Sequence, residues 1–118
     1  MADDGQILDG VREEIVREIT RVHEEAYGAG ISNVEITMGD DLIAVAMDVE
    51  LSPAERTLAD AGNGEAVRFT REEFQKAIGP TFCALVERAT GRRVVSFASR
   101  MIVEPPWSAE VFRLAPPD

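Results

Sequence analysis

The stretch L-I-A-V-A-M-D-V-E-L, residues 42–51, decides the fold because its first six positions are all apolar. In a strand, successive side chains point to opposite faces of the sheet. The two faces here carry Ile43, Val45, Met47, Val49 and Leu51 on one side and Leu42, Ala44 and Ala46 on the other. A strand that is apolar on both faces is typical of the middle of a sheet that is covered on both sides. We expect the second side to be covered by another copy of the protein.

A second strand precedes this one and forms a hairpin with it. In N-V-E-I-T-M, residues 33–38, Val34, Ile36 and Met38 alternate with polar residues, which predicts a strand with one buried face. The G-D-D sequence at 39–41 supplies the turn. We interpret its two aspartates as turn residues rather than a cation site, because hard cations need more oxygen ligands than two side chains supply.

The stretch L-S-P-A-E-R-T-L-A-D-A-G-N-G, residues 51–64, brings a hydroxyl, a carboxylate and two glycines close together. Ser52 and Glu55 have the spacing of a capping box, and Pro53 takes the first helical position, where a missing N–H does no harm. The glycines have neither P-loop nor dinucleotide-loop spacing. We therefore interpret the stretch as the two ends of a helix, not as a catalytic or phosphate-binding loop.

Two longer helical segments flank these elements. Apolar residues recur at helical spacing over residues 8–26, and Y-G-A-G predicts that this helix ends at Gly28. A second apolar stripe runs over residues 67–89. Within it, Thr70 and Glu73 repeat the capping-box spacing, which predicts a helix restart at Thr70. Gly79-Pro80 predicts a kink or break, because proline removes one backbone hydrogen bond.

The last part of the chain predicts two strands. The segment R-R-V-V-S-F-A-S-R-M-I-V, residues 92–103, is rich in β-branched residues, and E-V-F-R-L at 110–114 is a last short strand, with 105–107 as the connection. The order α-β-β-α-α-β-β predicts an α+β fold, a two-layer single domain over residues 1–118. We expect a small mixed or antiparallel sheet packed by helices, with loose ends at 1–5 and 115–118.

The first six predicted elements have the order of the prokaryotic K-homology RNA-binding domain, so a nucleic-acid-binding domain is one alternative. The loop A-G-N-G-E, however, is not the basic G-x-x-G that clamps nucleotides in that domain. The chain has 12 Lys and Arg against 22 Asp and Glu, and its formal net charge of -10 repels phosphate. We therefore expect no nucleic-acid partner and no direct binding to anionic lipid.

Several observations favour a cytoplasmic protein. The longest apolar run, residues 42–47, is far shorter than the roughly 18–20 residues that span a bilayer. The start M-A-D-D-G-Q lacks the charge and apolar run of a signal peptide. The single cysteine, Cys83, can form no internal disulfide. We expect no direct membrane insertion.

Few side chains suggest chemistry. We interpret His23 as a partly packed, solvent-reaching residue, because no second His or Cys lies at metal-ligand spacing. Cys83 stands among apolar residues and is interpreted as inert core. No nucleophile, base and orienting group occur together, so we assign no catalytic, cofactor-binding or metal residue. Arg92 and Arg93, at a strand entrance, are weak candidates for an anion site.

Four segments together resemble one family: H-E-E-A-Y-G-A-G at 23–30, L-S-P-A-E-R-T-L at 51–58, A-T-G-R-R-V-V-S-F-A-S at 89–99 and V-F-R-L at 111–114. In this order the chain resembles the MpsC-like family of small bacterial proteins, long described as a domain of unknown function. The family is named after a proposed sodium-translocating, membrane-potential-generating system, whose other components are membrane proteins linked to inorganic carbon uptake.

The resemblance supplies no catalytic residue, and it has two departures. Ile31 stands where a proline commonly closes the Y-G-x-G turn, and Arg100-Met101 replaces an acidic, histidine-bearing segment. If that segment carries a function in relatives, the function of residues 100–106 can differ in this chain.

The sequence and the resemblance lead to one main hypothesis. We expect a non-catalytic accessory or regulatory protein that needs no cofactor, forms a dimer and meets a membrane ion or inorganic-carbon transport protein. The alternative is a sensor of a small anion, for example bicarbonate, at Arg92 or Arg93. A protein-binding role requires an exposed apolar patch or a dimer, a sensor requires a pocket with converging donors, and an enzyme requires titratable groups in a cleft.

Overall fold

A computed structural model describes residues 4–28 and 30–117 of the chain. Its elements are α1 (Asp4–Tyr27), β1 (Ile31–Met38), β2 (Leu42–Val49), α2 (Pro53–Asp60), α3 (Gly64–Thr90), β3 (Val94–Ile102) and β4 (Trp107–Leu114). The predicted α+β order is confirmed, and the sheet is antiparallel rather than mixed.

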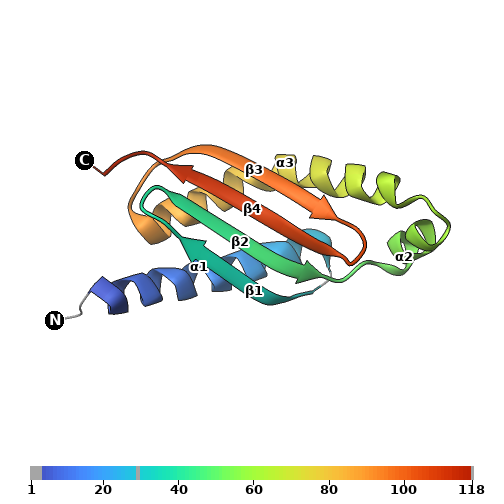
Figure 1. Cartoon of the computed structure of the whole chain (residues 1–118), viewed down its shortest axis with the longest axis horizontal. Coiled ribbons are helices and arrows are strands. Elements are labelled where there is room, and N and C mark those ends of the chain that lie inside the picture. The colour runs from blue at the N-terminus through green and yellow to red at the C-terminus, as the bar shows by residue number, and fades with distance from the viewer. Residues whose placement is uncertain (1–3, 29, 118) are drawn as a thin grey trace.

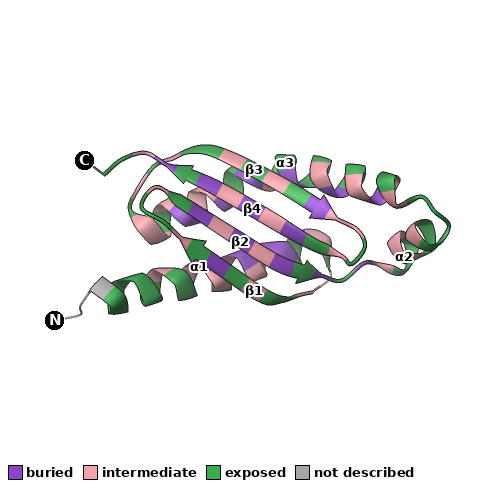
Figure 2. Ribbon diagram, viewed as in Figure 1, coloured by how far each residue is buried: buried purple, intermediate pink, exposed green. Residues whose placement is uncertain are grey.

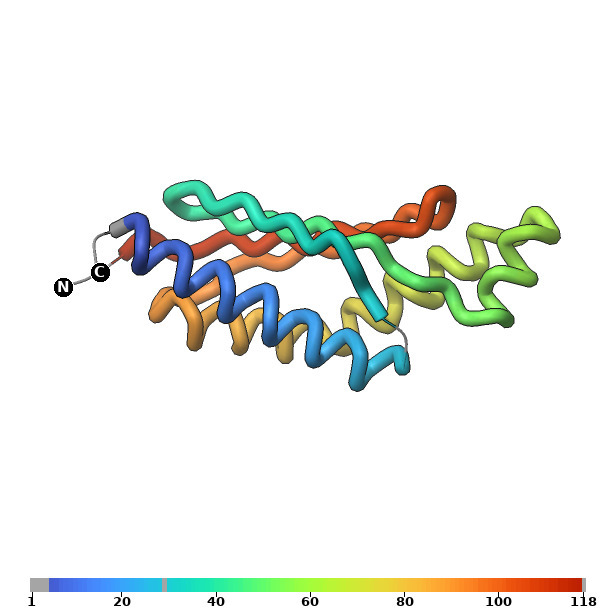
Figure 3. Tube along the Cα trace, turned by 90° about the horizontal axis from the view of Figure 1, so that it is seen from below, coloured from blue at the N-terminus to red at the C-terminus, as the bar shows by residue number. Residues whose placement is uncertain are grey.

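The sheet has the strand order β1-β2-β4-β3, so the hairpins β1–β2 and β3–β4 lie side by side and join through β2 and β4 (Figure 1). Helices α1 and α3 pack against the same face of the sheet, which forms the second layer (Figure 3). Helix α2 and the first turns of α3 extend past the end of the sheet, in a molecule 54 × 24 × 21 Å in extent (Figure 1).

The core lies between the sheet and the two long helices. Its fully buried side chains include Ile15 and Ile19 of α1, Phe82 of α3, Ile43 of β2 and Phe112 of β4. These residues share one face of each element, because β2 and β4 alternate with period two and α1 presents a stripe at helical spacing. In residues 42–51, the buried face is therefore the one that carries Ile43, Val45, Met47, Val49 and Leu51, as the alternation predicts.

The capping box at the start of α2 is present. The Glu55 N–H donates to the Ser52 hydroxyl (3.1 Å), and the Ser52 N–H donates to Glu55 Oε1 (2.9 Å). The prediction of a second capping box at Thr70 and Glu73 is wrong. Helix α3 already begins at Gly64 and continues through both residues, so their amides bond within the helix, and Glu73 pairs instead with Lys76 (3.1 Å).

Helix α3 also continues through Gly79 and Pro80, so the predicted break is wrong. A Cβ at Gly79 would lie 3.1 Å from the ring of Phe97, so the glycine lets the helix approach β3 closely. Packing of the helix on both sides of the proline outweighs the one hydrogen bond that the proline removes.

The ends of several elements differ from the prediction. Strand β4 begins at Trp107, within the segment expected to be a connection, and α1 begins at Asp4, within the end expected to be loose. Ala115 is also held, because its N–H donates to the Arg93 carbonyl (2.8 Å). Residues 1–3 and 118 lie outside the described residues.

Candidate functional site

The face of the sheet turned away from α1 and α3, called the open face below, is not covered by any of the described elements (Figures 1 and 3). Buried and partly exposed positions alternate along its central strands β2 and β4 (Figure 2). The apolar side chains of the open face are Leu42, Ala44, Ala46, Ala98, Ile102, Trp107, Ala109 and Val111. The centre of the open face is therefore apolar and made mainly of small side chains, and the charged residues Asp48 and Arg113 lie at opposite ends of its central strands.

Strand register arranges these residues in rows that cross the sheet. One row is Glu35, Ala46, Ala109 and Arg100, from β1 through β2 and β4 to β3. The next row contains Thr37, Ala44, Val111 and Ala98. The first row thus has an acid at one edge, two alanines at the centre and a base at the other edge.

Both edges of the sheet are partly occupied by side chains from the helices. On β3, the N–H of Val94 donates to Glu87 and the N–H of Met101 donates to Glu72, each at 2.9 Å. On β1, Arg12 donates to the carbonyl of Ile36 at 3.5 Å. Another strand that added to either edge would have to displace these contacts.

A buried ion pair joins the start of α2 to α3. Arg71, with 4% of its side chain exposed, donates to Glu55 Oε2 (2.7 Å), to Glu55 Oε1 (2.8 Å) and to the Glu50 carbonyl (3.0 Å). Its guanidinium also lies 4.4 Å from the centre of the Tyr27 ring. Hydrogen bonding to Arg71, together with the Ser52 amide, lowers the pKa of Glu55. This cluster holds α1, α2 and the end of β2 together and is structural.

A second buried acid, Glu110, lies on the helix-facing side of β4 with no exposed surface. The Ser108 hydroxyl donates to Glu110 Oε1 at 2.8 Å. Burial raises the pKa of Glu110 to about 7, and the hydrogen bond from Ser108 only partly opposes this rise. The neutral form of the carboxyl therefore persists to higher pH than in an exposed glutamate.

His23 is also fully buried, so the prediction that it reaches solvent is wrong. It lies on the sheet-facing side of α1, one helical turn from Ile19, and its ring packs 4.5 Å from that of Tyr27. Because His23 and Glu110 have no exposed surface, neither can meet a substrate in this conformation.

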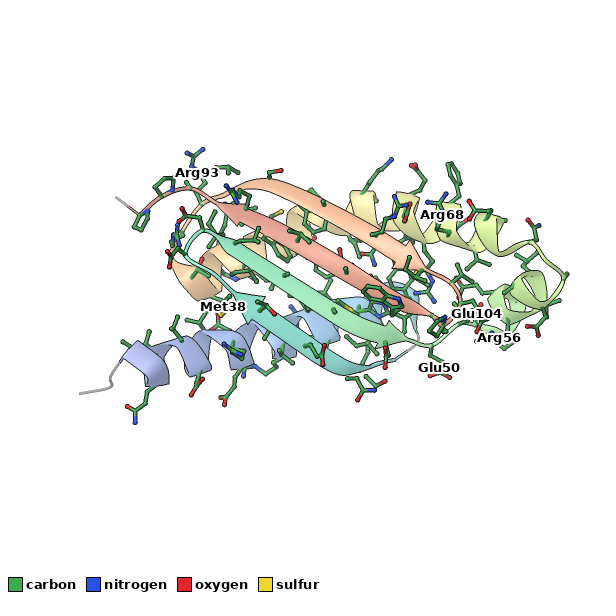
Figure 4. The ribbon with its side chains drawn as sticks, in the orientation of Figure 1. Met38, Glu50, Arg56, Arg68, Arg93 and Glu104 are labelled. Carbon is green, nitrogen blue, oxygen red and sulfur yellow. The ribbon has the colours of Figure 1, made fainter. Side chains whose placement is uncertain are left out.

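The two weak anion-site candidates, Arg92 and Arg93, differ in their surroundings. The Arg92 guanidinium donates to the carbonyls of Asp40 and Ala115 and to the Asp41 carboxylate. Arg93 is exposed and its side chain points away from the body of the protein (Figure 4). Both line an open hollow of ≈ 590 Å³ beside Pro116 and Pro117. Arg92 therefore ties the β1–β2 turn to the end of β4, and Arg93 is the one whose charge faces solvent.

Other charged groups are paired on the surface. Arg56 of α2 lies 3.6 Å from Glu104 of the β3–β4 turn, and the two are seen together at the α2 end in Figure 4. Cys83 is half-buried against the core, and burial raises the pKa of its thiol. Within residues 4–28 and 30–117, no three His, Cys, Asp or Glu side chains are grouped so that they could hold a metal ion.

The comparisons with known proteins give one result. The profile of a family described as "Na+-translocating membrane potential-generating system (MpsC)" matches residues 9–115. The chain belongs to the MpsC family. No curated protein and no solved structure matches it. None of the helices in the described part of this MpsC-family protein is long and apolar enough to cross a membrane.

Sequence reasoning missed two features of the site. Glu110 shares its strand face with Phe112 and Leu114, so strict alternation along S-A-E-V-F-R-L would have placed it in the core. The row of Glu35 and Arg100 could not be found in the same way, because it depends on which strands are neighbours in the sheet. Strand order is a tertiary property that no local pattern of this chain carries.

Proposed function

We propose that this protein is a non-catalytic accessory or regulatory component of a membrane-potential-generating ion-transport system, acting in the cytoplasm by binding other proteins. The observation that carries the proposal is the open face. Single exposed apolar side chains are normal on a protein surface, but a continuous apolar sheet face with a charged rim marks an interaction site. Membership of the MpsC family supports the link to a membrane-potential system.

The distribution of chemical groups supports binding over turnover. Two acids whose pKa values are shifted at partly or fully buried positions, Glu55 and Glu110, are held by the internal partners Arg71 and Ser108. The apolar side chains Ala46, Ala109 and Val111 instead lie on the side that the helices leave free. A bicarbonate sensor at Arg92 is disfavoured, because three internal oxygen atoms already accept from its guanidinium.

The proposal is tested by co-purification from native membranes, with and without crosslinking. Ala109→Arg places a large charge in the centre of the open face, and Ala77→Arg makes the same change on the exposed outer side of α3. We expect the wild type and Ala77→Arg to retain a membrane protein and Ala109→Arg to lose it. Equal retention of the two variants would contradict a binding role for the open face.

Liposomes separate a protein-mediated membrane contact from a direct one. With a formal net charge of -10, the purified protein is expected not to sediment with anionic vesicles. Strong sedimentation with protein-free vesicles would count against a partner-mediated link. Retention by no membrane preparation at all would remove the transport link from the proposal.

A further inference from the structure

We propose that the open face binds the open face of a second copy of this chain, around a two-fold axis that runs along the strands between β2 and β4. The inference rests on the proposed function only in that the open face binds protein. It goes further by naming the occupant, the axis and the pairs of side chains that meet.

The shape of the open face suits another sheet. Alanines occupy four positions of its two central rows, Ala44, Ala46, Ala98 and Ala109, so no large side chain stands up from the middle. Two sheets pack face to face at about 10 Å, and small side chains allow that approach. Four strands of about eight residues present about 500 Å² per copy, or about 1,000 Å² in total, which is the lower end for a specific interface.

The edge charges of the open face, Glu35 and Arg100, fit a second copy in one orientation. Asp48 and Arg113, at the ends of the central strands, then lie opposite Trp107 and Leu42 of the other copy. A two-fold axis along the strands places β1 of one copy over β3 of the other and keeps each row at its own level. In the row of Glu35, Ala46, Ala109 and Arg100, Glu35 then faces Arg100 of the other copy, and Ala46 faces Ala109. Symmetry repeats the contact, so each dimer contains the Glu35–Arg100 pair twice.

Other ways of joining two copies are worse. An axis across the strands would place β1 over β1 and β3 over β3, which brings like charges together at both edges. Growth of a continuous sheet would need free edges, but Glu72 and Glu87 occupy amides on the β3 edge. The face-to-face arrangement with the axis along the strands keeps these contacts and pairs unlike charges.

The two side chains can reach each other. Glu35 is exposed, and no ion pair with it is found in the described part of the chain. Arg100 is 71% exposed, and its contact with Glu72 is long, at 4.0 Å. Each edge strand lies about 7 Å from the axis, so a crossing angle of about 30° displaces facing residues by about 4 Å. Long side chains span that displacement.

The test is a charge exchange, read by light scattering of the purified full chain. The wild type is expected at twice the chain mass of 12.9 kDa, and Ala109→Arg is expected as a monomer. Glu35→Arg and Arg100→Glu each create two like-charge contacts per dimer and should weaken self-association by about tenfold or more. Lys76→Glu, a charge reversal on the outer side of α3, should leave self-association unchanged.

Mixing distinguishes this geometry from others. Glu35→Arg carries two bases and Arg100→Glu two acids, so an equimolar mixture forms heterodimers in which both contacts are unlike pairs. The mixture and the double variant E35R/R100E should both recover wild-type association. If the charge variants associate as strongly as the wild type, the proposed axis is wrong. If the wild type is monomeric at all accessible concentrations, a second copy does not occupy the open face.

The outcome for the proposed function is read separately, by membrane co-purification. A monomeric wild type together with loss of membrane retention in Ala109→Arg would leave the proposed function standing and remove this inference. A dimer with the expected charge dependence, but with no membrane retention, would support this inference and contradict the proposed function.

Discussion

The two faces of the sheet are built from the same four strands but from different side chains. On β4, Phe112 is fully buried against the helices, and its neighbour Val111 points to the open face and is partly exposed. On β2, Ile43 and Met47 are buried, whereas Ala44 and Ala46 lie on the open side. The covered face is filled by large side chains that fix the fold, and the centre of the open face carries small ones. Size, rather than hydrophobicity alone, distinguishes the two faces.

On the covered face, we expect the largest effect on stability from a substitution of Phe112. Phe112→Ala removes a ring with no exposed surface and leaves a cavity under α1 and α3. We expect a loss of about 3–5 kcal/mol in the free energy of unfolding, measured by urea denaturation. A loss below about 1 kcal/mol would mean that this face is not the rigid core of the domain.

Glu110 is an acid buried on the covered face. Its folded pKa of about 7 lies above the unfolded value, so the folded chain binds more protons between about pH 4.5 and 7. Stability from this group is therefore lost as pH rises through that window. Glu110→Gln should remove this loss and stabilise the protein by about 3 kcal/mol at pH 8, and by little at pH 4.5. Equal pH dependence of the two proteins would contradict burial of the charge.

Glu55 has the opposite pH behaviour and acts as an internal reference for that comparison. Its pKa is lowered, so the stability it provides is present above its unfolded pKa and is lost as pH falls through the folded pKa. Because both proteins keep Glu55, this term cancels in the difference between them.

Ser52 lies outside both faces, at the start of α2. Ser52→Ala removes the hydroxyl that accepts from the Glu55 amide, and we expect a loss of about 0.5–2 kcal/mol in stability. Self-association and membrane retention should be unchanged, because the residue does not belong to the open face. Loss of membrane retention without loss of stability would show that Ser52 is more than a cap.

Val111→Ala gives the smallest expected effect on unfolding. The side chain is only partly buried, so its truncation should cost about 1 kcal/mol or less in the monomer. Dimerisation, measured by the concentration dependence of light scattering, should weaken more than stability does. The reverse ranking would mean that the open face supports the fold rather than association.

The sequence predicted the order of the elements because that order rests on local patterns. The alternation in residues 42–51 and the Ser52–Glu55 spacing act over a few residues, and both hold in the structure. The Thr70–Glu73 spacing is just as regular, but it does not mark a helix start. Helix α3 already begins at Gly64, so the amides near Thr70 bond within the helix. A capping signal identifies a helix start only where the preceding residues cannot be helical.

The open face could be predicted only in part. The apolar second face of residues 42–47 predicted a cover on both sides of the strand, but two long helices could have covered one face each. That both helices lie on the same face depends on how they pack with each other and with Phe97 and Phe112. Those contacts join residues far apart in the chain, so they are absent from any local pattern.

Helix α2 extends past one end of the sheet (Figure 1). A two-fold axis along the strands would therefore place the two α2 helices of the proposed dimer at the same end of the assembly. If each α2 helix contacted one site of a symmetric membrane protein, the dimer would bind two equivalent sites. Once the first copy is bound, the second would meet its site at high effective concentration, and overall avidity could exceed the affinity of a single copy by about 10²–10⁴. A change in dimerisation alone would then switch the protein between weak and firm attachment.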